Sequence, residues 1–119
     1  MLATHFQKNS LACAVCHEMD HNNIETDLKQ RVKRYIEVEN AALAKITIAV
    51  PDNSMLKEFA DSAMTMILSY FSDAKHFMEN NDPINAFAAL NYSYGWIDSL
   101  VRLGILDGHD DHSLFTLYR

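Results

Sequence analysis

The stretch Tyr70–Leu106, YFSDAKHFMENNDPINAFAALNYSYGWIDSLVRLGIL, carries the strongest structural signal in the chain, because it contains two helical patterns and the turn between them. The turn is the polar run 80–83. Asp82 is suited to cap the second helix, and Pro83 to occupy its first position, where the N–H that proline lacks has no partner within a helix. The stretch therefore predicts an antiparallel helical hairpin.

The helix that begins at Pro83 is apolar around most of its circumference. One narrow sector is small or polar, and it consists of Ala88, Asn91, Gly95, Asp98, Ser99 and Arg102. A helix with so much apolar surface is normally covered by more than one neighbour. Trp96 lies opposite the polar sector, and we expect the chain itself to cover it, with a homo-oligomer contact as the alternative. Gly104 is expected to end this helix in the left-handed conformation.

Two further helices are predicted upstream. Apolar residues recur at spacings of three and four, as in an amphipathic helix, at Ile24, Leu28, Val32, Tyr35, Ile36, Leu43 and Ile46. Asn22 and Glu25 have the spacing of a capping box at the start of this helix. The β-branched run 46–48 and the following Pro51 are expected to end it. The cap of the next helix, which leads into the hairpin, is one of Asp52, Asn53 and Ser54.

The composition agrees with a helical protein. Three Gly and two Pro among 119 residues are too few for the frequent turns of a many-stranded β fold. The chain is long enough for one domain with its own core. We therefore predict an all-α protein, an up-down three-helix bundle over residues 23–119 with a short C-terminal tail. Residues 1–22 are predicted to be a flexible N-terminal extension, with a second reading in which its first part is not translated in the cell.

The charge and hydropathy exclude some classes of partner. The net charge is −6, and residues 61–119 contain three Lys or Arg against eight Asp or Glu. A nucleic-acid binder needs a basic stripe, and the basic run 29–34 has acidic neighbours, so nucleic acid is disfavoured as a partner. No apolar run has the ~20 residues of a membrane span, and the N-terminal apolar patch is shorter than an export signal. We expect a cytoplasmic protein without a membrane partner.

A family resemblance rests on motifs in the hairpin. They are Tyr70-Phe71, Asp73-Ala74, His76-Phe77, Asn81-Asp82, Ala86-Phe87, Ala89, Tyr92-Ser93-Tyr94-Gly95-Trp96-Ile97-Asp98 and Arg102-Leu103-Gly104. With these motifs the chain resembles the archaeal proteins grouped as domain of unknown function 357, and weaker similarity extends from about Ile24 to the closing run 114–117. The resemblance implies an archaeal, intracellular, all-helical domain, and it carries no particular activity with it.

The run CAVCH at 13–17 has two chemical readings. A C-x-x-C-H pattern attaches haem, but that chemistry follows export, for which the sequence shows no signal. Cys13 and Cys16 also have the spacing of a zinc knuckle, with His21 or His5 to complete the ligand set. Few apolar residues surround them to fold around an ion. We therefore expect a flexible extension without a cofactor, keep zinc as the alternative and regard haem as disfavoured.

Four polar residues of the hairpin are candidates for a ligand site: Asp73, Asn91, Asp98 and Arg102. In an antiparallel hairpin Asp73 lies level with Asn91, whereas Asp98 and Arg102 are one turn apart on the second helix. Gly95 lies among them and leaves room for a polar ligand close to the backbone. The competing reading is a satisfied polar network that fixes the register of the helices.

Enzymatic readings of the sequence lack parts. Arg102 and His109 have the Arg-x6-His spacing of HEPN ribonucleases, whose helical pairs this hairpin resembles, but Gly104 interrupts the helix between them. An acidic set could offer ligands to a divalent cation, and it consists of Asp107, Asp110 and Asp111 with His109 and His112. We predict a non-catalytic binding or assembly module that contacts a protein partner or a second copy, and we keep a HEPN-like ribonuclease as the alternative.

Overall fold

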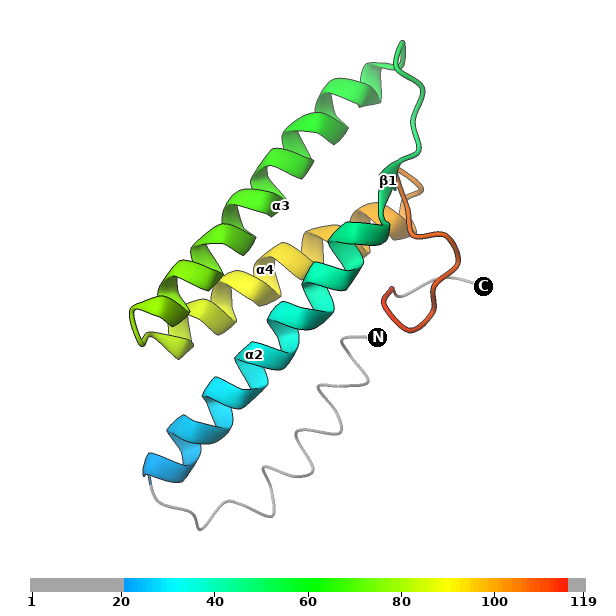
Figure 1. Ribbon diagram of the computed structural model, residues 1–119. Coiled ribbons are helices and arrows are strands. Elements are labelled where there is room, and N and C mark those ends of the chain that lie inside the picture. Colours follow the sequence, from blue (N-terminus) through cyan, green and yellow to red (C-terminus); the bar gives the residue numbers. More distant parts are fainter. Residues whose placement is uncertain (1–20, 116–119) are drawn as a thin grey trace.

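The computed structural model describes residues 21–115, with side chains from Asn23 onward, and these residues form three helices and one pair of short strands (Figure 1). In chain order the elements are α2 His21–Lys45, β1 Thr47–Ile48, α3 Met55–Glu79, α4 Pro83–Arg102 and β2 Leu106–Asp107. α2 and α4 run in one direction and α3 in the other. The predicted all-α class and up-down three-helix arrangement are confirmed. No helix of this described part is long and apolar enough to cross a bilayer.

Helix α4 is the central helix of the bundle (Figure 1). It packs most extensively against α3 and next against α2, whereas α2 and α3 meet only sparsely. Buried residues therefore occur on more than one side of α4, at Pro83, Ala86, Ala89, Leu90, Ser93, Tyr94, Ile97, Leu100 and Val101. This central position explains the apolar pattern of its sequence. Trp96 is half-buried against the core, and whether a second copy covers its exposed part stays a prediction.

The N-termini of α3 and α4 are capped by residues that the sequence indicates. The Ser54 hydroxyl accepts a hydrogen bond from the backbone N–H of Leu56 at 3.1 Å, which identifies the cap of α3 among three candidates. The Asp82 carboxylate accepts from the backbone N–H of Asn85 at 3.2 Å, and Pro83 occupies the first turn of α4. Each cap satisfies an N–H that has no partner within its helix.

Left-handed residues end α3 and α4. Asn81 has a φ of 59° and Gly104 a φ of 80°. Past Gly104, the N–H of Ile105 donates to the carbonyl of Leu100 at 3.0 Å, so that the chain wraps back on the final turn of α4. The predicted stop at Gly104 is confirmed, and Asn81 supplies the equivalent stop for α3, because Asn tolerates this conformation better than most residues.

The pairing of β1 with β2 is a feature that the sequence does not indicate. The two strands are antiparallel, with Thr47 opposite Asp107. The sequence indicates only that the run 46–48 ends a helix, whereas these residues also pair with the segment after α4, a distant partner that local patterns do not show.

The start of α2 also differs from the prediction. The helix begins at His21, so the expected cap Asn22 lies inside it.

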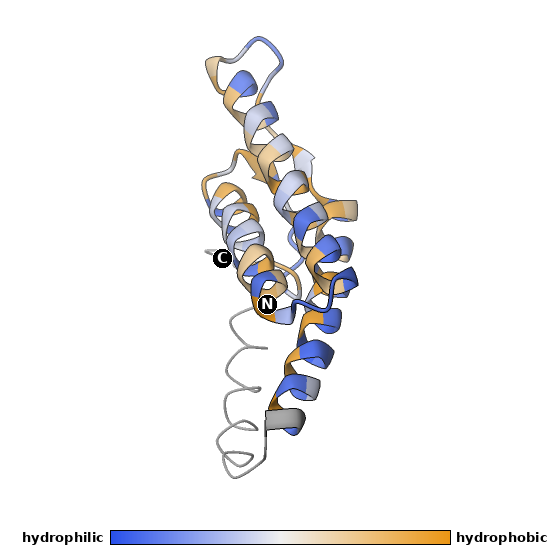
Figure 2. Cartoon of the chain, turned by 90° about the vertical axis from the view of Figure 1, so that its left-hand side faces the viewer, coloured by the Kyte–Doolittle hydropathy of each residue, from blue (hydrophilic) through white to orange (hydrophobic). Residues whose placement is uncertain are grey.

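The segment after β2 folds back onto the helices and closes one end of the core. Phe115 is fully buried, and a Cβ atom built on Gly108 would lie 2.7 Å from its ring carbon Cδ2. Leu114 is partly buried against the same apolar cluster. This part of the predicted tail belongs to the core, whereas residues 116–119 lie outside the described part. Each helix has a hydrophobic and a hydrophilic side (Figure 2).

Candidate functional site

Aromatic and apolar side chains lie along the surface seam between α3 and α4. The ring centroids of Tyr70 and Tyr92 are 4.6 Å apart, and those of Tyr92 and Trp96 are 6.5 Å apart, so three rings from two helices form a row. Helical spacing places further apolar side chains on the same two flanks. We call the whole set the aromatic seam, and it consists of Phe59, Met66 and Tyr70 on α3, Tyr92 and Trp96 on α4, and Leu103 at the end of α4.

The aromatic seam is open to solvent. Tyr92 keeps 47% of its surface exposed, Phe59 45% and Leu103 72%. Large apolar side chains that are exposed singly are common on soluble proteins, but contiguous apolar surface marks a place where another molecule binds. The aromatic seam is therefore the candidate interaction surface.

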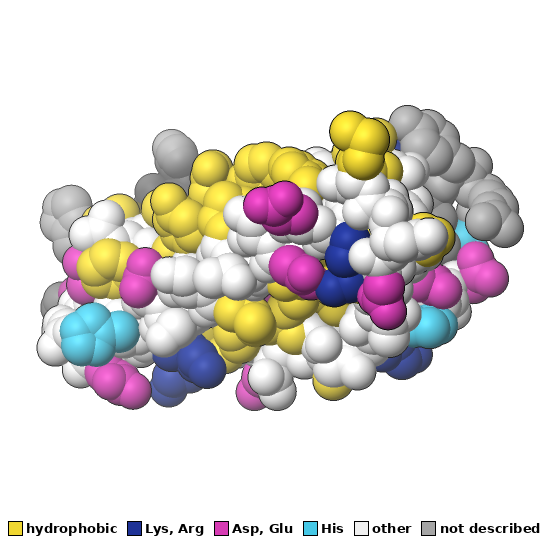
Figure 3. Space-filling view, turned by 90° about the horizontal axis from the view of Figure 1, so that it is seen from above, with side chains coloured by type: hydrophobic (Ala, Val, Ile, Leu, Met, Phe, Trp, Pro, Cys, Tyr) yellow, Lys and Arg dark blue, Asp and Glu magenta, His cyan; other side chains and the backbone are white. Residues whose placement is uncertain are grey.

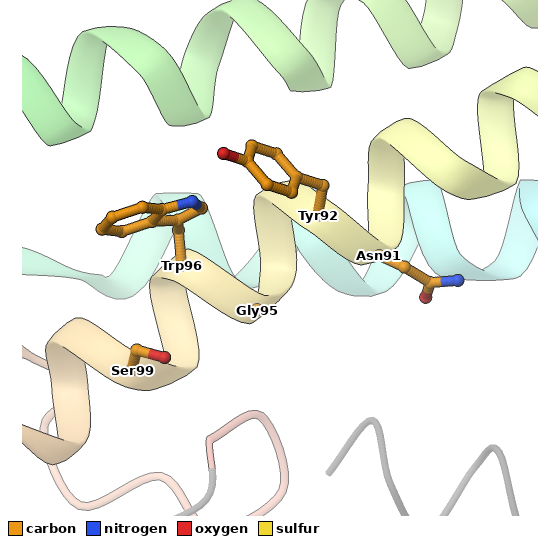
Figure 4. Close-up of a pocket in the computed structure, with 5 residues that line it drawn as sticks. All are labelled: Asn91, Tyr92, Gly95, Trp96 and Ser99. Carbon is orange, nitrogen blue, oxygen red and sulfur yellow. The ribbon is translucent and has the colours of Figure 1, made fainter.

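A shallow hollow of about 350 Å³ lies beside Gly95 (Figure 4). Its lining residues are Asn91, Tyr92, Gly95, Trp96 and Ser99. Tyr92 and Trp96 point from α4 towards the side of α3, whereas Asn91 points away from them. Apart from the adjoining backbone of α4, no atom of the described residues lies within 4 Å of a Cβ built on Gly95, so the missing side chain leaves the helix surface open at this point.

Asp73 and Asn91, two of the predicted ligand residues, lie on different sides of one ring. Asn91 lines the hollow beside Gly95, and Asp73 lines a neighbouring hollow of about 310 Å³ together with Tyr70 and Tyr92. Tyr92 is therefore a wall of both hollows. Asn91 thus lies at the hollow beside Gly95, whereas Asp73 lines the neighbouring one. Ligand binding by these residues stays a prediction.

Asp98 and Arg102 follow on the polar sector of α4, and Arg102 is exposed in its last turn. His109, the predicted ribonuclease partner of Arg102, follows β2 with a φ of 56°. Its Nε2 lies 3.2 Å from the Thr47 hydroxyl, and its backbone N–H donates to the Asp107 carboxylate at 2.7 Å. His109 is thus oriented by groups from the two strands. Joint action with Arg102 stays a prediction.

The acidic segment after β2 makes contacts within the protein. Lys45 Nζ lies 2.5 Å from Asp111 Oδ2, and the backbone N–H of Ser113 donates to Oδ1 of the same carboxylate at 3.0 Å. The hydrogen bonds from Lys45 and Ser113 hold the pKa of Asp111 below its usual value. These contacts join the end of α2 to the C-terminal segment.

The predicted metal ligands form two groups, the acidic set after β2 and the cysteines near the N-terminus. Among the side chains of residues 23–115, no three of His, Cys, Asp or Glu gather in a way that would hold a metal ion. Cys13 and Cys16 lie outside the described residues, and so does the side chain of His21. The zinc knuckle therefore stays a prediction.

A buried carboxyl group was missed by the sequence analysis. Glu39 of α2 and Ser93 of α4 are both fully buried, and their Oε2 and Oγ atoms are 2.7 Å apart. Ser93 Oγ also lies 3.2 Å from the backbone carbonyl of Ile67 in α3. Burial raises the pKa of Glu39 to about 7, although the hydrogen bond with Ser93 opposes this shift. We call Glu39, Ser93 and the Ile67 carbonyl the polar junction.

The sequence does contain a signal for the polar junction. Alternate spacings of three and four, the pattern of a packed helix interface, run through α2 at Val32, Tyr35, Glu39, Ala42 and Ile46. The same pattern runs through α4 at Ala86, Leu90, Ser93, Ile97 and Leu100. In each helix one polar residue occupies a core position. A carboxyl and a hydroxyl at such positions indicate a buried polar contact between the two helices.

The comparisons with known proteins identify a family. The family described as "Protein of unknown function (DUF357)" matches residues 34–106, from α2 to β2, which includes the polar junction and the hairpin. No curated protein and no solved structure matches the chain. Since the family match covers more than half of the 119 residues, the chain belongs to the DUF357 family.

Proposed function

We propose that this protein is a non-catalytic binding module whose aromatic seam receives an amphipathic helix of a partner protein. The observation that carries the proposal is the row of rings formed by Tyr70, Tyr92 and Trp96 at the surface of α3 and α4. Two packed helices with an apolar stripe along their junction form a groove into which the apolar side of a third helix fits. Aromatic side chains at the centre of such grooves supply much of the binding free energy.

The charge of the hairpin favours a basic partner. Residues 55–102 contain three Lys or Arg against six Asp or Glu. Asp73 lies at the seam beside Tyr70 and Tyr92, and Figure 3 shows acidic side chains close to exposed hydrophobic ones on one face. A second copy of the chain has the same net charge of −6 and is repelled. A helix whose apolar side is bordered by Lys or Arg is attracted.

The hollow beside Gly95 gives the groove an anchoring position. A side chain of the partner helix that enters it would contact the Trp96 ring and the Asn91 amide, both of which line the hollow. Ring, amide and hydroxyl groups at this position suit binding, because they supply dispersion contacts and hydrogen bonds. An archaeal origin and an intracellular location, implied by the resemblance in the sequence, belong to the same proposal.

Trp96 fluorescence tests the proposal directly, because Trp96 is the single tryptophan of the chain and lies in the seam. The probe is a helical peptide of about five turns with Leu on one side and Lys on the other. Its control has Glu at every Lys position. We expect the Lys peptide to shift the Trp96 emission, to bind more tightly than the Glu peptide and to bind more weakly as salt is added. Equal binding of both peptides would contradict a basic partner.

Matched variants locate the binding surface. Tyr92→Ala should weaken binding of the Lys peptide by about 30-fold, or ~2 kcal/mol, the cost of losing a central aromatic contact. Leu68→Ala is the control, because Leu68 is as exposed as Tyr92, at 50% against 47%, but points away from the seam on α3. The same loss in both variants would place the binding elsewhere. A dimer in light scattering that Tyr92→Ala dissociates would identify a second copy as the occupant and overturn the proposal of a partner helix.

A further inference from the structure

The polar junction is the place where all three helices share a hydrogen-bonding group. Ser93 Oγ of α4 lies 2.7 Å from Glu39 Oε2 of α2 and 3.2 Å from the Ile67 carbonyl of α3. Since α2 and α3 meet only sparsely, the Ser93 hydroxyl of α4 lies between groups of two helices that otherwise have little contact with each other. The other oxygen of the carboxyl, Glu39 Oε1, is buried and has no hydrogen-bond partner among the described residues.

The number of hydrogens at the junction favours a protonated Glu39. A serine hydroxyl has one hydrogen, yet two acceptors lie within reach of Ser93 Oγ. If Glu39 is ionised, Ser93 must give its hydrogen to the carboxylate, and the negative charge still leaves Oε1 unpaired in the core. If Glu39 is protonated, its O–H donates to Ser93 Oγ, and Ser93 donates to the Ile67 carbonyl. The neutral form therefore satisfies both short contacts of Ser93. The charged form satisfies only one of them, and it buries a negative charge without a cation beside it among the described residues, which costs free energy.

The groups around Glu39 do not offset that cost. On α4, burial raises the pKa of the Tyr94 phenol, and the negative charges of Asp98, Glu39 and Asp111 raise it further, so Tyr94 brings no positive charge to the junction. From α3 the buried side chains are all apolar: Ala60, Ala63, Ile67, Phe71 and Ala74. Among the described residues, burial and Ser93 are the causes of the shifted pKa of Glu39, and no cation contributes to it.

We propose that the polar junction is a proton-dependent contact that holds α2 on the α3–α4 hairpin most tightly when Glu39 is protonated and lets α2 open more often when Glu39 ionises. Release would uncover apolar side chains of α2 that are buried in the closed bundle, among them Val32, Tyr35 and Ala42. The polar junction consists of buried groups of the core, so its proton dependence does not require that the aromatic seam binds a helix.

The direction of the pH dependence follows from the two states of Glu39. Its pKa is about 7 in the closed bundle and 4.5 where it is solvated, so the closed state binds the proton more tightly. The stabilisation is complete below the solvated pKa and is lost as pH rises through the folded pKa. Between about pH 5.5 and pH 8.5 these two values imply a roughly 30-fold rise in the equilibrium constant for opening α2.

Amide hydrogen exchange and carboxyl NMR test this contact in the full chain. With exchange rates corrected for their intrinsic pH dependence, we expect amides of α2 to open roughly 30-fold more often at about pH 8.5 than at about pH 5.5. Amides of α3 and α4 should change less. The carboxyl carbon of Glu39 should titrate near pH 7.

The matched variant is Glu39→Gln, whose amide has the same shape and stays neutral throughout. Its α2 amides should show no comparable pH dependence. A Glu39 carboxyl that titrates near 4.5, or an α2 opening that rises equally in wild type and Glu39→Gln, would overturn the proposal. If Glu39→Gln does not fold, the wild-type carboxyl titration decides the question by itself.

Discussion

The hydroxyl of Tyr94, in the middle of α4, donates a hydrogen bond to the backbone carbonyl of Leu114. Tyr94 is almost fully buried, and the bond, which is itself partly buried, ties the central helix to the segment that follows β2. A buried hydroxyl needs such a partner, and the carbonyl of a connecting segment needs a donor. The bond therefore serves both groups.

Removing this hydroxyl should destabilise the protein. In Tyr94→Phe the Leu114 carbonyl loses its donor, which costs about 1–3 kcal/mol and lowers Tm by at least several degrees, since ~1 kcal/mol corresponds to about 4–8 °C in a small domain. Scanning calorimetry gives the measurement. Tyr92→Phe is the control, because the Tyr92 ring is half-exposed and its variant should melt with the wild type.

Two glycines should respond to alanine in opposite directions. Gly108→Ala places a Cβ 2.7 Å from the buried Phe115 ring and should cost about 1–3 kcal/mol in urea unfolding. Gly95→Ala adds a Cβ in open space on a helix and should stabilise the protein by about 0.5–1 kcal/mol. Equal stability of Gly108→Ala and wild type would mean that the Phe115 ring does not rest on this backbone.

The contact between Lys45 and Asp111 should make the protein sensitive to acid. The hydrogen bond from Lys45 is the main cause of the lowered pKa of Asp111. Its stabilisation is present above the ordinary pKa of 3.8 and is lost as pH falls through the lower folded pKa. In Lys45→Met the fall of Tm on acidification should therefore be smaller than in wild type. If Tm falls equally in Lys45→Met and wild type on acidification, the ion pair does not persist in solution.

The ribonuclease alternative predicts cleavage that depends on Arg102. We expect the purified protein to leave total RNA intact, both without metal and with magnesium, because His109 is oriented by Thr47 and Asp107. Gel analysis of the RNA gives the readout. Cleavage that disappears in Arg102→Ala would establish the ribonuclease reading and contradict a module that only binds.

The N-terminal extension should be dispensable for folding. A chain that starts at Met19 should melt within about 4 °C of the full chain, because the apolar periodicity of the first helix begins only at Ile24. A larger loss would show that the first residues contribute to the core. If a chelator causes the same loss in the full chain and zinc reverses it, Cys13 and Cys16 hold a metal.

The parts of the fold that the sequence predicts depend on local chemistry. The cap at Asp82 and the stop at Gly104 act on backbone groups within one helical turn, so they are visible in a short window of sequence. The pairing of β1 with β2 joins segments that are far apart in the chain, and no local pattern contains it. Asp73 and Asn91 line different hollows for a related reason. Two residues can lie at the same level along antiparallel helices and still point in different directions, because the level does not determine how each helix is rotated about its axis. Tyr92 lines both hollows.

Glu39 shows a different limit of sequence reading. A glutamate in an amphipathic helix is usually assigned to the solvated side, and this assignment hides it here. Its spacing from Val32 and Ala42 nevertheless puts it in the core pattern, and Ser93 occupies the matching position of α4. Its position in the spacing of three and four residues indicates its burial better than its residue type does, because packing determines which side of a helix is buried.

The pairing of β1 with β2 also determines the geometry of any opening motion. Because Thr47 is held opposite Asp107, the C-terminal end of α2 remains anchored to the end of α4 while the rest of α2 separates. If α2 opens as proposed, the strand pair would be the hinge about which the helix rotates. Displacement would be smallest near Lys45 and would grow towards His21, at the other end of this 25-residue helix.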